Sequence, residues 1–142
     1  MNRIYLTILP LVAALCISAC ATVTDIPENL SPAEIIQRAQ EASDRNRYKV
    51  ALQYYEALLE RNRINSTLIC TAEYEIAFIH YKQKKYGEAR EEFNALLERY
   101  NTPDAELLPQ QFKILAKRVL EQIDEKEKSR LRFFSRPATA AK

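Results

Sequence analysis

The side chains that could carry out catalysis are few and lie far apart along the chain. His80 is the only histidine, and Cys70 lies ten residues before it. If both lie on one straight helix, about 15 Å of helical rise separates them, which excludes a direct nucleophile–base pair. The carboxylates recur beside Arg and Lys on the outer sides of predicted helices, where solvated ion pairs are the default. We therefore expect a packed histidine, a buried cysteine, no enzymatic activity and no cofactor or metal site.

Composition argues against several classes of ligand. The 142 residues include 21 Lys and Arg against 19 Asp and Glu, a formal net charge of +2 that is too small to indicate nucleic acid. A single glycine excludes a glycine-rich phosphate loop. We expect neither nucleic acid nor a small-molecule substrate. Ala, Leu, Glu, Arg, Lys and Gln dominate, and these residues favour helices.

The N-terminal residues have the order of an export signal. The positive charge of Arg3 precedes an apolar run from Ile4 to Leu15, and small residues lead to a cysteine in Ile17-Ser18-Ala19-Cys20. That tetrapeptide resembles the lipobox of bacterial lipoproteins. The resemblance implies that a signal peptide of residues 1–19 is removed and that Cys20 carries diacylglycerol and an N-acyl chain, which would hold the protein at the lipid bilayer. The alternative is an uncleaved membrane helix over residues 4–21, which is near the shortest spanning length.

The residues after Cys20 indicate where the chain would be held. By the same family resemblance, Ala21 stands where an aspartate often signals retention in the inner membrane, so the periplasmic side of the outer membrane is favoured. Residues 20–30 are short, polar and contain proline, which predicts a lipidated tether. A helical domain is expected over residues 31–128 and a flexible basic tail over residues 129–142.

The domain is predicted to contain five helices. The segment Ser31-Pro32-Ala33-Glu34 combines an N-cap serine, a proline at the first helical position and a glutamate at the third, which indicates a helix start. Apolar periodicity then predicts helices over residues 32–45, 48–61, 66–83, 86–100 and 109–128. The last of these has one apolar face, formed by Phe112, Leu115, Ala116, Val119, Leu120 and Ile123. That face requires a neighbour to cover it.

An internal repeat indicates how these helices pack. Residues 48–61 align with residues 86–99 without a gap at an offset of 38, so that Ala51 matches Ala89 and Tyr55 matches Phe93. One helix earlier, Ala39 matches Ala77. This pattern resembles the tetratricopeptide repeat (TPR), in which small residues recur where two helices touch and a large aromatic follows. The resemblance implies an all-α stack of two TPR-like helical hairpins. The final helix then serves as a cap or as half of a third hairpin.

The resemblance also implies a recognition surface. In the TPR family the first helix of each hairpin lines the concave side, which places Tyr74, Phe78, Tyr81 and Lys82 there. Their spacing puts them on one helical face independently of the family. Exposed aromatics beside a cation suit protein binding. The alternative is that the last helix covers this face as core.

The combination of lipobox, tether and hairpins is similar in architecture to the TPR lipoproteins of outer-membrane β-barrel assembly. It favours an anchored scaffold or adaptor that binds envelope proteins. A structural tether to the cell wall or membrane is the alternative.

The C-terminal residues form a second candidate surface. Residues 128–142 contain five basic and no acidic residues, with Leu131, Phe133 and Phe134 among them. Such a segment suits an acidic partner or an anionic bilayer surface. The alternative is a frayed, solvated terminus.

Overall fold

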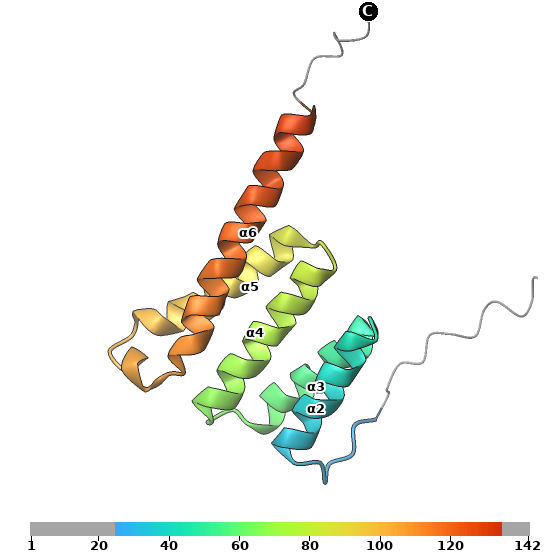
Figure 1. The fold of residues 1–142 in the computed structure, drawn as a ribbon. Helices are drawn as coiled ribbons and strands as arrows, with labels where there is room; N and C mark the ends of the chain where they lie inside the picture. Colours follow the sequence, from blue (N-terminus) through green and yellow to red (C-terminus); the bar gives the residue numbers. More distant parts are fainter. Residues whose placement is uncertain (1–24, 135–142) are drawn as a thin grey trace, which may run out of the picture.

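The structure is a computed structural model that describes residues 25–134, and this part of the chain is helical and contains no strand (Figure 1). The predicted all-α stack of helical hairpins is confirmed. The expected signal peptide, the acylation site Cys20 and the last residues of the tail lie outside the described residues. The elements are α2 (Pro32–Asp44), α3 (Tyr48–Arg61), α4 (Ser66–Lys82), α5 (Tyr86–Glu98), the 3-10 segments η2 (Arg99–Asn101) and η3 (Ala105–Leu107), and α6 (Gln110–Phe134).

The first helix begins as the sequence predicts. The Glu34 backbone N–H donates to Ser31 Oγ at 3.3 Å, and the Ser31 backbone N–H donates to Glu34 Oε2 at 2.8 Å. This reciprocal capping box satisfies two amides that the helix itself leaves unpaired. The bonds from Ser31 also hold the pKa of the Glu34 carboxyl below its ordinary value.

The hairpins α2–α3 and α4–α5 close through the same backbone turn. Asn46 and Lys84 adopt the left-handed conformation, with φ of 57° and 63°, and they are 38 residues apart. In each turn the next residue donates its N–H to the carbonyl five residues earlier, at 2.8 Å in the first hairpin and 3.0 Å in the second. The backbone therefore repeats with the same period as the sequence.

Small residues lie where the helices of each hairpin touch. Ala39 and Ala51 in the first hairpin, and Ala77 and Ala89 in the second, are fully buried. Because a methyl group lets two helix backbones approach closely, the large rings of Tyr55 and Phe93 can fill the adjoining space, and both are fully buried. Residues that align between the two copies therefore also occupy equivalent positions in the packing of the two hairpins.

Helix α6 covers the second hairpin. It packs against α5 and α4, and its predicted apolar face is buried at Phe112, Ala116, Val119 and Ile123 and half-buried at Leu115 and Leu120. The outer side of α6 is mostly polar. Within the described residues, α6 thus ends the stack as a single helix instead of opening a complete third hairpin.

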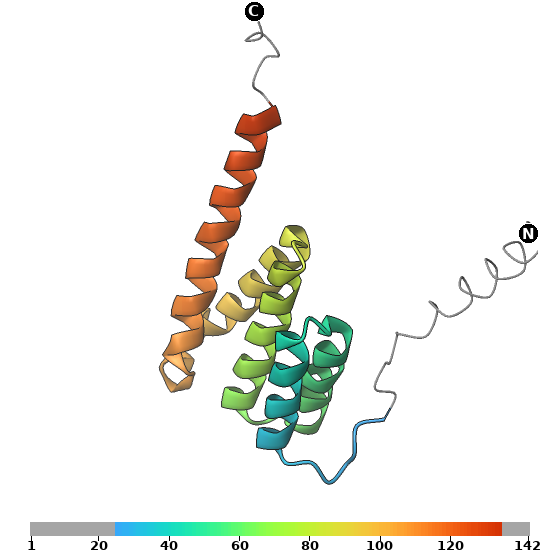
Figure 2. The same cartoon turned by 45° about the vertical axis from the view of Figure 1, so that its right-hand side comes forward.

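Helix α6 is longer than the sequence analysis predicted. It continues through Lys128 to Phe134, so the first six residues of the expected flexible tail are helical. Its final turns extend beyond the body of the stack (Figures 1 and 2). The sequence contains no glycine or proline between Gln110 and Phe134 to end the helix. The helix therefore continues beyond Ile123, its last buried residue.

The expected tether also needs correction. Residues 25–30, called the strap below, lie against the first hairpin. Ile26 and Leu30 pack on the core of that hairpin. The Arg61 guanidinium donates to the carbonyl oxygen of Ile26 at 2.7 Å and to that of Pro27 at 2.9 Å. Of the eleven residues predicted to form a tether, the structure describes six, and this segment is held to the first hairpin through Ile26, Pro27 and Leu30.

No helix within residues 25–134 is both long and apolar enough to span a membrane.

Candidate interaction surface

Helix α4 carries all four residues predicted to bind a partner, and it lies between the first hairpin and α6 (Figure 1). Tyr74, Phe78 and Tyr81 form a continuous series of rings, with centroids 5.8 Å apart for the first pair and 5.7 Å for the second. Both pairs are stacked. The predicted shared face is therefore present, and the burial of each residue decides what it can contact.

Tyr74 is a core residue. Its side chain is 8% exposed, and its ring centroid lies 5.6 Å from that of Phe93 and 5.5 Å from that of Phe112. Because α6 places Phe112 over this position, the expectation that Tyr74 belongs to an exposed recognition surface needs correction. For Tyr74 the structure shows the alternative, in which the last helix covers the face as core. The desolvation that accompanies this burial raises the pKa of the Tyr74 phenol.

Phe78 and Tyr81 remain partly exposed. The Tyr81 hydroxyl donates to Gln122 Oε1 in α6 at 2.9 Å, and Lys126 Nζ lies 6.0 Å from the Tyr81 ring centroid. An open pocket of about 380 Å³ adjoins Tyr81, lined by Arg118, Glu121, Gln122, Glu125 and Lys126. Tyr81 thus joins α4 to α6 and forms one wall of an accessible depression.

Lys82 connects α4 to the first hairpin. Its Nζ donates to Ser43 Oγ at 2.5 Å and lies 5.3 Å from the Phe78 ring centroid and 5.7 Å from that of Tyr48. Among the described residues Lys82 forms no ion pair with a carboxylate. Two aromatic faces and a hydroxyl therefore hold a partly exposed cation at the junction of the hairpins.

A carboxylate that the sequence analysis overlooked lies near this cation. Burial raises the pKa of Glu75 above its ordinary value, Lys82 opposes that rise, and Asp44 adds to it. Glu75 precedes Ile76 and Ala77 in the apolar part of α4. The sequence of α4 alone does not show that Asp44 of the first hairpin lies close to it. The charges that act on Glu75 therefore come from both hairpins.

His80 and Cys70 occupy separate environments. His80 Nδ1 lies 2.7 Å from Glu92 Oε2, and His80 Nε2 lies 3.9 Å from Glu88 Oε2, so the partly buried ring links α4 to α5. His80 is thus packed between two helices but is not fully buried, and the sequence analysis did not foresee its carboxylate partners. Cys70 is fully buried, as predicted, and burial raises the pKa of its thiol. A protonated, enclosed thiol is a poor nucleophile.

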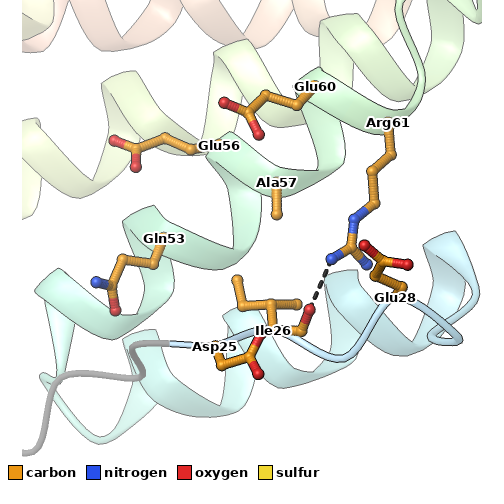
Figure 3. Close-up of a pocket in the computed structure, with 8 residues that line it drawn as sticks. All are labelled: Asp25, Ile26, Glu28, Gln53, Glu56, Ala57, Glu60 and Arg61. Carbon is orange, nitrogen blue, oxygen red and sulfur yellow. Dashed lines mark hydrogen bonds between the residues drawn. The ribbon is translucent and has the colours of Figure 1, made fainter.

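The strap forms a second depression that was not predicted. A pocket of about 340 Å³ lies between the strap and α3, and four carboxylates line it: Asp25, Glu28, Glu56 and Glu60 (Figure 3). Arg61 points into this acidic region but donates to the strap carbonyls. Among the described residues, no cluster of three or more His, Cys, Asp or Glu side chains is arranged to hold a metal ion. The carboxylates give this end of the stack a negative surface.

Comparison with known proteins gives one relative without an assigned function. The chain is 34% identical over 94 residues to a protein of Treponema pallidum (strain Nichols) described only as an uncharacterized protein. The alignment covers 64% of this chain and 38% of the Treponema protein. The chain therefore spans well under half of that relative. No family model matches the chain, and no solved structure matches it.

Proposed function

We propose that this protein is a lipoprotein anchored through Cys20 whose TPR-like hairpin stack acts as a scaffold or adaptor for envelope proteins. The lipobox-like segment Ile17-Ser18-Ala19-Cys20 supports the anchor. The 38-residue repeat supports the TPR resemblance, because both copies share the same turn and the same buried alanines. By resemblance, the periplasmic side of the outer membrane and the assembly of its proteins are the favoured setting.

The observation that carries the adaptor proposal is the partly exposed surface of Phe78, Tyr81 and Lys82. Aromatic side chains contribute large contact areas to protein interfaces, and a cation beside them adds directional binding. Lys82 is already oriented by the rings of Phe78 and Tyr48. A partner carboxylate or carbonyl can therefore bind it without first ordering a long side chain, which lowers the entropic cost of association.

The test is a crosslinked pull-down of the full-length protein from native membranes. Wild type is compared with Phe78→Ser/Lys82→Glu and with the control Leu107→Ser, which removes an exposed apolar side chain from η3. We expect envelope proteins to be captured by wild type and by the control, and lost with the double variant. The same envelope proteins captured equally by all three forms would place the binding site elsewhere.

Two further measurements test the anchor and the alternative. Intact-mass analysis of the membrane-purified protein should show cleavage before Cys20 and added acyl mass, and Cys20→Ser should abolish both. If an acylated, folded protein captures no envelope protein but binds purified peptidoglycan, the structural tether replaces the adaptor.

A further inference from the structure

The last turns of α6 form a tip that lies outside the packed stack. The final fully buried residue of α6 is Ile123, and Arg90 of α5 makes ion pairs of 2.7 Å with Asp124 and with Glu127. From Lys128 on, the side chains described are exposed. The seven residues from Lys128 to Phe134, at 1.5 Å each, extend about 10 Å beyond these ion pairs.

The tip combines exposed apolar side chains with positive charge. Leu131 is 69% exposed and Phe133 is 77% exposed. Basic residues stand at positions 128, 130 and 132, and the sequence continues through Arg136 to Lys142 without an acidic residue. Residues 128–134 contain three basic and no acidic side chains; just before them, Glu125 pairs with Lys128 at 3.2 Å and Glu127 pairs with Arg90.

The size of the tip favours a bilayer over a folded protein as its partner. A helix about 10 Å wide and 10 Å long offers roughly 300 Å² of lateral surface. A stable protein interface buries about 800 Å² on each partner. A lipid surface has no such requirement, because apolar side chains enter the acyl boundary by roughly 5–10 Å while basic side chains remain among the headgroups.

We propose that residues 128–134 of α6 are a membrane-contacting tip that enters a bilayer surface rich in anionic phospholipid end-on. End-on entry is needed because Leu131 and Phe133 lie about 200° apart around the helix, so only the end of α6 can insert both. The basic side chains of Arg130 and Arg132 supply the charge that selects anionic headgroups. The inference takes from the proposed function only that the chain is held at a membrane. It does not depend on a protein partner.

The absence of tryptophan from the chain makes a direct test possible. Phe133→Trp places a single fluorophore at the tip. Leu107→Trp places one at another exposed site, before the start of α6. The full-length protein, in the form that membranes yield, is reconstituted into vesicles of phosphatidylcholine alone or of equal parts phosphatidylcholine and phosphatidylglycerol. Emission wavelength and quenching by brominated lipid are then measured.

We expect a blue shift and quenching for Phe133→Trp in vesicles that contain phosphatidylglycerol, and neither for Leu107→Trp. Each basic residue near an anionic surface changes partition about fivefold, so adding Arg130→Glu/Arg132→Glu should shift the equilibrium toward the unbound tip by at least about 25-fold. Equal signals at residues 107 and 133 would overturn the proposal, because they would reflect anchoring alone. Equal quenching at residue 133 in both lipid mixtures would overturn selection by charge. No quenching in either mixture would overturn insertion of the tip into a bilayer.

Discussion

Tyr74→Ala should destabilise the stack and loosen α6. The tyrosine ring lies between Phe78, Phe93 and Phe112, with centroid separations of 5.8, 5.6 and 5.5 Å, and Phe112 belongs to α6. Removing a buried aromatic ring costs about 3–5 kcal/mol. At about 4 °C for each kcal/mol in a domain of this size, the melting temperature should fall by about 12–20 °C. That loss is a large part of a typical total stability of about 5–15 kcal/mol.

The assay is urea unfolding of the purified protein followed by far-ultraviolet circular dichroism. Tyr74→Phe is the matched control, because it keeps the ring contacts and should change the free energy of unfolding by less than about 1.5 kcal/mol. Phe78→Ala should cost less than Tyr74→Ala because Phe78 is only partly buried. If Tyr74→Ala unfolds within about 1 kcal/mol of wild type, α6 does not cover this position and the assignment of Tyr74 to the core is wrong.

Three further changes test other parts of the structure. Gly87→Ala should stabilise the protein by about 0.4–1 kcal/mol in urea unfolding. Apart from the adjacent residues and the backbone of α5 itself, nothing lies within 4 Å of the added methyl group, and alanine restricts the unfolded chain. Glu75→Gln tests a pKa that burial raises above the ordinary value of 4.5. Between the ordinary pKa of the unfolded chain and the raised pKa of the folded protein, the folded state binds more protons at Glu75. The free energy of unfolding of wild type should therefore fall as pH rises through this interval, and that of the glutamine variant should fall less. Arg61→Ala should release the strap and accelerate hydrogen exchange at the Leu30 amide. Arg63→Ala, an exposed control two residues later, should leave exchange at Leu30 unchanged. Equal exchange in both variants would show that the guanidinium bonds do not hold the strap.

Helix starts and hairpin packing could be predicted because they depend on local patterns. The Ser31 cap, the apolar period of 3.6 residues and the paired alanines each lie within one helix or one repeat. The position of Asn46 and Lys84 in matching left-handed turns follows from the same offset of 38 residues. Local sequence patterns of this kind predict the structure well because the tertiary contacts of the folded protein favour the same local conformations.

Two of the features that were not predicted depend on distant neighbours, and a third depends on where a helix was expected to end. The bonds from Arg61 to the strap join residues 34 and 35 positions apart, and no periodic pattern announces them. Whether Tyr74 is a binding residue or a core residue depends on the path of α6, which the face of α4 alone does not determine. The extension of α6 to Phe134 reflects the absence of a helix breaker, whereas the prediction ended the helix where the apolar stripe ended.

The docked strap has a consequence for how an anchored form of this protein would meet its partners. With residues 25–30 bound to the first hairpin, only the five residue steps from Cys20 to Asp25 remain as a link, and these reach at most about 18 Å. An acylated chain would therefore diffuse in two dimensions with its rotation already restricted. A soluble adaptor loses orientational freedom each time it meets a partner, whereas an anchored one would lose much of that freedom once, when it is anchored. Its collisions with other membrane-bound proteins would therefore begin from a narrow range of angles.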